Sequence, residues 1–447
     1  MRSLGACLSG VLYCAGLAAQ SLNTGTILGN VTDASGATVP GVTIRVVSES
    51  TAFQREATTD AEGNYQILQI PAGTYRIEFE KMGFQRSVDN RGIALSAGQS
   101  LRINGNLKIG SLTESVQVDA KVAQVDTATA NVSATVYGTQ VQELALTTRS
   151  FTQLVTLQPG VASNQAQQPG FGSNTSVPFS FNGGQQSSNN WLLDGGRNQD
   201  TYNGNNLTMV NLDAIAEVRM ERNAYSAEFG RNSGAQINVI TKSGTNAFHG
   251  TAFEFFRNDH LDARNFFAAK KPANRYNNFG WTLGGPIKKN KLFFFLSNEY
   301  RRIRQSTGTR TAIVPTDAQL QGNFAGGRTI VDPNTGQPFP NNQIPANRID
   351  PNALSLIRNW YARPVPGFQS GALNYTSSEP DGTRYRSALG RVDYNRSEKL
   401  TFFGRYNIDS TRLDSPYGLF QSNTMPISAP SQQAHIMYTA NASANWT

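Results

Sequence analysis

The C-terminal half of this 447-residue chain is dominated by stretches in which apolar and polar residues alternate. In the last of them, Ala434 to Thr447, Ile436, Tyr438 and Trp446 fall on one side and Thr439, Asn441 and Ser443 on the other. Strict alternation predicts a strand with one apolar and one wet face. Five earlier stretches share the pattern: HGTAFEFFRND, YNNFGWTLGGPI, NKLFFFLSNEYRR, RYRSALGRVDYN and KLTFFGRYNIDSTR. Each has about the length that a tilted strand needs to cross a bilayer.

The two faces of these stretches predict which side meets lipid. Apolar residues outward and polar residues inward are typical of a transmembrane β-barrel with a wet lumen. Leu400, Phe402, Tyr406 and Ile408 share one face, and Thr401, Arg405, Asn407 and Asp409 share the other, while Phe279, Trp281 and Leu283 also lie together. Five aromatic residues near strand ends are expected at the membrane interfaces: Tyr276, Tyr300, Tyr385, Tyr394 and Trp446. Connections alternate between short turns and one long excursion, 303 to 383.

The first 20 residues read as a secretory signal peptide. Arg2 precedes an apolar run that ends in small residues at Ala18 and Ala19. The alternative, a lipoprotein signal ending at Cys14, is disfavoured by the large Tyr13 before that cysteine. Both cysteines of the chain lie in this segment, so the mature protein is expected to lack disulfides, thiolate metal sites and thiol nucleophiles.

The remaining composition argues against nucleic-acid binding and catalysis. The net charge of +8 is scattered rather than clustered on aromatic-rich stretches. His249, His260 and His435 have no metal-site spacing, and Asp332 to Gly336 lacks the later ligands of a calcium loop, so a β-turn is expected there. No serine can be assigned a His/Asp pair. We therefore expect no enzyme activity, no metal and no cofactor.

Residues 24–108 alternate as short strands separated by Gly- and Pro-containing turns. Val42, Ile44 and Val46 form one alternating run, and Tyr75, Ile77 and Phe79 form another. This spacing predicts a small β-sandwich. The sequence GNVTDxxGxxVPGV followed by TDxxGNYxIxxIPAGxY resembles the carboxypeptidase-regulatory-like domain, which is transthyretin-like in fold. The resemblance implies an accessory module without peptidase machinery.

Residues 111–243 contain a helix candidate at 139–161 and several plug-like motifs. Val141, Leu144, Leu154 and Leu157 are the expected buried positions of the helix, with Pro159-Gly160 as its stop. The segment then resembles the plug domain of TonB-dependent outer-membrane transporters, although Arg222-Asn223-Ala224 replaces a common Arg-Gly-Pro turn. The matching residues include Leu193, Asp194, Gly195, Arg222, Gly230 and Asn238.

Residues 246–447 resemble part of the barrel of the Oar-like subfamily of these transporters, on the strands above and on TIVDPNTGQPFPNNQIPANRIDPNAL in the long excursion. The whole chain then reads as a mainly β protein: a sandwich, a small α/β plug and the first strands of an antiparallel transmembrane barrel. The resemblance implies an outer-membrane location and two partners besides the bilayer, an extracellular ligand and the energy-transducing TonB complex.

A TonB-contact segment is expected just before the plug. Such segments are extended runs of Val, Thr and Ala, and LTESVQVDA at 112–120 fits this description. The candidate contact residues are Thr113, Glu114, Ser115, Val116, Gln117 and Val118. The alternative is that this stretch is a final strand or linker of the N-terminal domain.

The resulting hypothesis is a receptor that imports an oligosaccharide, a peptide or a metal chelate. A surface adhesion or secretion-related protein on the same scaffold, and a soluble carbohydrate-binding module, are the alternatives. Six barrel strands are fewer than the twenty-two that the family uses, and an open sheet would leave unpaired edge amides in hydrocarbon. The final stretch is therefore expected to be a truncation point of a longer receptor.

Overall fold

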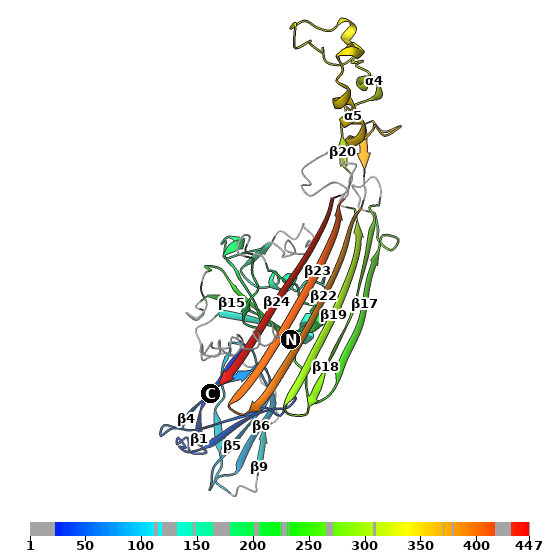
Figure 1. Ribbon diagram of the computed structural model, residues 1–447. Coiled ribbons are helices and arrows are strands. Elements are labelled where there is room, and N and C mark those ends of the chain that lie inside the picture. Colours follow the sequence, from blue (N-terminus) through cyan, green and yellow to red (C-terminus); the bar gives the residue numbers. More distant parts are fainter. Residues whose placement is uncertain are drawn as a thin grey trace, which may run out of the picture.

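The computed structural model describes residues 23–446 except 111–114, 119–131, 145, 147–148, 164–178, 201–203, 205, 224, 226–229, 231, 265–270, 307–309, 370, 378–379 and 416–430. Three bodies follow one another along the chain (Figure 1). An N-terminal sandwich lies beneath a curved sheet of long strands, and a plug packs on one side of that sheet. The signal peptide predicted at 1–20 lies outside the described residues.

The N-terminal body is a sandwich of two sheets. One has the order β4-β1-β7, with β8 also paired to β1, and the other has the order β3-β2-β5-β6-β9. The strands are β1 (Thr24–Asp33), β2 (Thr43–Ser48), β3 (Gln54–Thr58), β4 (Asn64–Pro71), β5 (Gly73–Glu80), β6 (Arg86–Leu95), β7 (Ser100–Arg102), β8 (Gly105–Leu107) and β9 (Ser115–Val118).

The core of the sandwich is the apolar set that alternation predicts. Ile44, Val46 and Ile77 are completely buried between the sheets. The hydroxyl of Tyr65 donates to the carbonyl of Ile103 at 2.7 Å, which satisfies its one buried polar atom. The sandwich predicted at 24–108 is therefore confirmed as a fold, and it also takes up β9 as a parallel edge strand beside β6.

The plug is built on a mixed sheet of order β10-β15-β16-β13-β14. Two short helices precede most of these strands and pack against the same apolar core. Its elements are β10 (Val132–Tyr137), α2 (Gly138–Glu143), α3 (Thr152–Val155), β11 (Val161–Ser163), β12 (Phe179–Phe181), η1 (Gln186–Ser188), β13 (Asn190–Leu193), β14 (Gly196–Arg197), η2 (Leu212–Ala214), β15 (Ile215–Asn223) and β16 (Gln236–Thr241).

The single helix expected at 139–161 is wrong in extent. The chain breaks between α2 and α3, where Arg149 adopts a left-handed backbone conformation with φ 52°. Val141 and Leu154 are completely buried as expected. Leu144 and Leu157 are 40% and 56% exposed, because the break changes the direction of the helical face. Side-chain periodicity across a break no longer follows one helix.

The third body is a six-stranded antiparallel sheet in strict chain order, β17-β18-β19-β22-β23-β24. We call this sheet the barrel sheet, or the barrel. Two-residue and three-residue turns join its strands at the end near the sandwich, as predicted (Figure 1). The strands are β17 (His249–Asn258), β18 (Asn274–Lys288), β19 (Leu292–Gln305), β22 (Asp381–Ser397), β23 (Leu400–Ser415) and β24 (Ser431–Trp446).

The two faces of this sheet separate as predicted. Thr401, Arg405 and Asp409 of β23 are buried toward the plug, and Phe402 and Tyr406 are exposed on the opposite face. Two of the five predicted interface aromatics, however, are wrong. Tyr276 and Tyr385 are only 7% and 3% exposed and point inward, since they share the parity of the buried Asn278 and Ser387.

The long excursion between β19 and β22 projects from the end of the sheet opposite the sandwich (Figure 1). Asp332 to Gly336 is a tight turn, but an α-turn rather than the predicted β-turn, since the amide of Gly336 donates to the carbonyl of Asp332 four residues earlier at 2.8 Å. Among the described residues, no helix is long and apolar enough to cross a membrane. The elements of the excursion are β20 (Arg310–Ala312), α4 (Asp317–Leu320), η3 (Pro340–Asn342), η4 (Ala346–Arg348), α5 (Pro351–Trp360) and β21 (Tyr375–Ser377).

Candidate functional site: the plug and barrel interface

The turn after β13 positions the central carboxylate of the interface. Leu193 and Gly196 pair across a two-residue hairpin turn made by Asp194 and Gly195, whose φ angles are 49° and 74°. Asp-Gly is a preferred sequence for such a turn, because both positions require positive φ. The amide of Gly195 donates to Oδ1 of Asn238 on β16 at 3.2 Å, which ties the turn to the plug sheet.

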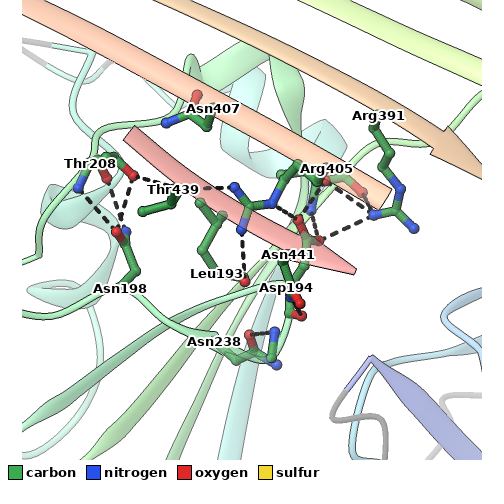
Figure 2. Close-up of polar contacts among 12 residues, drawn as sticks. Leu193, Asp194, Asn198, Thr208, Asn238, Arg391, Arg405, Asn407, Thr439 and Asn441 are labelled. Atoms are coloured by element: carbon green, nitrogen blue, oxygen red, sulfur yellow. Dashed lines mark hydrogen bonds and ion pairs between the residues drawn. The ribbon is translucent and has the colours of Figure 1, made fainter. Parts of the chain in front are cut away.

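The Asp194 carboxylate is completely buried and is held from both the plug and the barrel. Within the plug, it accepts hydrogen bonds from the amide and hydroxyl of Thr241, both at 2.9 Å. From the barrel, Arg405 Nε lies 2.7 Å from Oδ2 and Arg391 Nη1 lies 3.1 Å from Oδ1. The Asn441 side chain on β24 donates to the Asp194 carbonyl at 2.7 Å. We call Asp194, Arg391, Arg405 and Asn441 the latch (Figure 2).

The two arginines of the latch have further partners that fix their orientation. Arg391 forms an ion pair with Asp393 on its own strand at 2.8 Å and lies over the Phe403 ring. Arg405 donates to the Leu193 carbonyl at 3.3 Å and to the Thr439 hydroxyl at 3.0 Å. Three adjacent barrel strands therefore hold one hairpin turn of the plug. Removing one partner of such a buried pair typically costs about 3–5 kcal/mol.

A second contact holds the plug loop around Met209. The Met209 amide donates to the Asp409 carboxylate at 2.9 Å, and its carbonyl accepts from the Asn407 amide at 3.3 Å. Asn198 shapes the loop by accepting hydrogen bonds from the amide and hydroxyl of Thr208. Apart from its abundance of Asn, this loop carries no sequence signal that predicts the contact, whereas alternation does predict Asn407 and Asp409 on the inner face of their strand.

A third contact is made by the break between the two plug helices. Arg149 forms a buried ion pair with Asp213 of the plug, and its guanidinium lies 3.9 Å from the centre of the Phe255 ring on β17. Burial raises the pKa of Asp213, an effect that the facing Arg149 opposes. The Arg149 carbonyl accepts from Arg301, which is itself paired with Glu299 at 2.8 Å. The interface is thus polar and charged over three separate areas.

The predicted plug residues divide between the latch and other places. Leu193, Asp194, Gly195 and Asn238 come together at the latch. Arg222 lies at a register shift in β15, between the paired residues Glu221 and Asn223, and donates to the Pro159 carbonyl at 3.2 Å. Gly230 is exposed. Neither contributes to the latch.

The predicted TonB-contact residues are only partly described. Thr113 and Glu114 lie outside the described residues. Ser115, Val116, Gln117 and Val118 form β9, which pairs with Arg86 to Asp89 of β6. This placement agrees with the alternative that the stretch ends the N-terminal domain as a strand, and it leaves the TonB contact a prediction.

The three histidines lie on the sheet of long strands and in the turn after its first strand. Within the part of the chain that the structure describes, no group of three or more metal-ligating side chains occurs. His249 and His260 are exposed at the two ends of the β17 region, and His435 lies on β24 opposite Thr411.

A cavity of about 490 Å³ lies where the sandwich, the plug and the barrel meet. Its walls include Tyr75 of the sandwich, Glu217 and Thr241 of the plug, and Arg391 of the barrel. The Glu217 carboxylate accepts from the Ala97 amide at 2.8 Å, and burial raises the pKa of Glu217. The sandwich also contacts a barrel turn, because Arg55 donates to the Glu398 carbonyl at 3.2 Å.

Comparison with known proteins assigns each body to a described domain. Residues 26–108 match the carboxypeptidase regulatory-like domain, residues 126–235 the TonB-dependent receptor plug domain, and residues 240–447 an outer membrane beta barrel domain.

One curated relative agrees with these matches. The TonB-dependent transporter Oar of Myxococcus xanthus is 32% identical over 305 residues, which cover 64% of this chain and 27% of that protein. The chain therefore spans about a quarter of the length of this curated relative.

Among solved structures, the outer membrane transporter YddB of Escherichia coli is 10% identical, with a TM-score of 0.45, over 70% of this chain and 37% of its own. A ferric enterobactin receptor of Pseudomonas aeruginosa is 13% identical, with a TM-score of 0.42, over 70% of this chain and 38% of its own.

Proposed function

Because this chain belongs to the Oar-like TonB-dependent receptors of the outer membrane, we propose that it binds an extracellular ligand and admits it to the periplasm when TonB pulls on its plug. The ligand is an oligosaccharide, a peptide or a metal chelate. The described part of the long excursion, from β20 to β21, projects from the end opposite the sandwich, and the excursion supplies the capture surface. TonB acts at the other end, on the segment 113–118.

The observation that carries this proposal is the way in which the plug is held. In the described residues the plug sheet and the barrel sheet share no strand, so the plug can leave without breaking a barrel ladder. The contacts that must be exchanged for water are side-chain contacts such as those of the latch. Charged groups regain hydration when they separate, which offsets part of the lost pairing energy. An interface of this kind holds firmly at rest and yields to a directed pull.

The segment 113–118 is suited to transmit that pull. It connects the sandwich to the plug, and its described part is a four-residue strand on a sheet edge. Peptides of this kind bind partners by adding a strand to an exposed edge, with side-chain identity secondary. A strand held by so few residues can leave β6 and pair with TonB at small cost.

Cysteine cross-linking in cells tests the TonB contact. The two native cysteines, Cys7 and Cys14, precede the described part of the chain. Within the described residues, no native thiol therefore competes with an introduced cysteine for the cross-link. Val116→Cys and Val118→Cys are expected to form a disulfide with a cysteine placed in TonB. Ser35→Cys, exposed on the sandwich, is the matched control and is expected to form none.

Deletion of 112–120 provides the second arm of the test. The deletion is expected to abolish energised uptake and to leave the plug folded in the barrel, as judged by protection of β16 from hydrogen exchange. Equal cross-linking at Ser35→Cys and Val116→Cys, or undiminished uptake after the deletion, would contradict the proposal.

A further inference from the structure

Six arginines project from the lipid-facing side of the barrel sheet, at the end from which the long excursion leaves. They are exposed, whereas their neighbours in sequence alternate inward: Ile303 and Tyr385 are 7% and 3% exposed. We call them the outer arginine cluster: Arg275 of β18, Arg302 and Arg304 of β19, Arg384 and Arg386 of β22, and Arg412 of β23.

The strand register places these like charges directly opposite one another. Arg275 pairs with Arg304, and Arg384 lies between Arg302 on one side and Arg412 on the other. Like charges directly opposite each other on one face destabilise a sheet. The cluster therefore needs negative charge from outside the sheet, or it weakens the barrel at this rim.

Among the described residues, two ion pairs supply part of that negative charge. Asp259 lies 3.6 Å from Arg275, and Asp414 lies 3.5 Å from Arg412. Both distances are long for ion pairs. In the described part of the chain, these six guanidinium groups and two carboxylates leave an excess of four positive charges (6 − 2). Arg302, Arg304 and Arg384 line a surface hollow of about 440 Å³.

The lipid-facing side chains of β19 from Leu292 to Tyr300 belong to the apolar band of the barrel. The position of the arginine cluster relative to this band shows which part of the bilayer it faces. Leu292 and Tyr300 are eight residues apart on the lipid face of β19. That is roughly 27 Å along the strand. It is about 20 Å along the membrane normal at the usual barrel tilt, close to the height of an apolar band. The Phe279 and Tyr300 rings stack at 5.4 Å at its upper limit, and the arginines come immediately beyond them.

This placement requires headgroups rather than acyl chains around the arginines. An arginine on the lipid face costs about 2–4 kcal/mol at the bilayer midplane but about 0–1 near the interface. The outer arginine cluster therefore lies at headgroup height, where anions are available and where Arg386 also rests over the Tyr300 ring at 5.5 Å. Guanidinium groups bind phosphate oxygens by paired, charge-assisted hydrogen bonds.

We propose that the outer arginine cluster binds the phosphorylated headgroup of an outer-leaflet lipid, with the acyl chains of that lipid lying on the aromatic band below. The phosphates neutralise the facing arginines and fasten the wall of the barrel to the leaflet. This lipid site does not depend on transport, and it remains if the imported ligand or the TonB contact is assigned differently.

The test measures lipid binding to the full chain in phosphatidylcholine nanodiscs. The probes are lipid A carrying two phosphates, lipid A from which both phosphates have been removed, and inorganic phosphate. The triple variant R302Q, R304Q, R384Q removes the centre of the cluster. The control R328Q, R358Q, R396Q removes the same number of exposed arginines from the excursion and from the opposite end of β22.

The bisphosphorylated lipid is expected to bind the triple variant at least tenfold more weakly than the wild type, and the control variant within about twofold of it. Removal of the phosphates is expected to weaken binding to the wild type to a similar extent. This arm keeps the test decisive if the triple variant fails to fold, which heat-modified gel migration would show. Equal binding of both lipids would overturn the proposal, and so would inorganic phosphate that binds as tightly as the lipid, since the site would then take a free anion.

Discussion

The sandwich and the plug are held in place by different kinds of contact. The apolar core of the sandwich lies entirely within residues 27–107. The core of the plug includes Phe295, Tyr385 and Leu389 of the barrel, and its firmest contacts with the barrel are buried charges. A self-contained core keeps its shape when the chain is pulled. The plug shares its core with the barrel and is held there by polar contacts that water can replace, so it is suited to leave the barrel. In the proposed function, the sandwich is therefore the fixed module and the plug is the movable one.

The largest expected effect comes from removing the centre of the latch. Asp194→Ala leaves Arg405, whose side chain is 2% exposed, without its buried counter-charge. We expect the plug to be held about 3–5 kcal/mol less firmly in the barrel. Hydrogen exchange should show faster opening of β13 and β16, with the sandwich strands unchanged. In a double-mutant cycle with Arg405→Gln, strictly additive losses would contradict a direct pairing.

A core substitution in the sandwich should accelerate hydrogen exchange in the sandwich and leave exchange in the plug unchanged. Ile77→Ala creates a cavity at a completely buried position, and we expect a loss of about 2–4 kcal/mol in the free energy of unfolding of the sandwich. Exchange in β1 and β5 should accelerate, while β13 and β16 keep their protection. If the plug loosened equally, the two bodies would form one cooperative unit and the comparison would fail.

A smaller effect is expected from strain in the latch turn. Gly195→Ala places a side chain at φ 74° and should cost about 1–2 kcal/mol in plug docking. Gly336→Ala introduces similar strain at φ 70° in the long excursion, where a Cβ would meet nothing within 4 Å. Exchange at the plug should therefore respond to the first variant and not to the second.

The smallest effect concerns the junction between the two bodies. Because burial raises the pKa of Glu217, the folded junction binds its proton more tightly than the unfolded chain does. The protonated Glu217 therefore contributes to the stability of the folded protein below the pKa that Glu217 has in the unfolded chain. This contribution is lost as the pH rises through the higher pKa that Glu217 has in the folded protein. Glu217→Gln keeps an acceptor for the Ala97 amide. The variant should remove this pH dependence, measured as thermal stability between pH 4 and pH 7. An unchanged pH profile would contradict a buried, titrating Glu217.

Much of the fold could be predicted because alternation along a strand survives any tertiary context. The six long strands, the faces of β23 and the sandwich core all follow from it. The plug helices could not be placed, because the left-handed backbone at Arg149 is set by its contacts with Asp213 and Phe255 rather than by local sequence. The prediction that Tyr276 and Tyr385 lie at the membrane interface was wrong, because proximity to a strand end does not determine which face of the sheet a side chain is on. Tyr385 lies on the inner face and packs beneath Arg301.

Individual residues of the latch could be predicted from the sequence, but their contacts with one another could not. Resemblance to the plug motif identifies Leu193, Asp194 and Gly195 but not their turn, and alternation predicts Arg405 on the inner face of its strand. Their pairing was not predictable, since 211 residues separate Asp194 from Arg405 (405 − 194) and no local pattern relates them. The loop at Met209 binds through its backbone, which leaves no signature in side-chain identity.

Force applied through TonB tests the central claim most directly. A Cβ at Gly196 would lie 3.0 Å from the side-chain nitrogen of Asn441, so Gly196→Cys with Asn441→Cys can form a disulfide between plug and barrel.

A TonB domain on a cantilever should attach to the segment 113–118 and extract the plug while the sandwich stays folded. With the disulfide reduced, extension from 118 to the end of the plug near 243 should release about 43 nm of chain. With it oxidised, extension should stop near 196 after about 27 nm. Equal lengths in both states, or unfolding of the sandwich before the plug, would contradict a plug that TonB draws out of its latch.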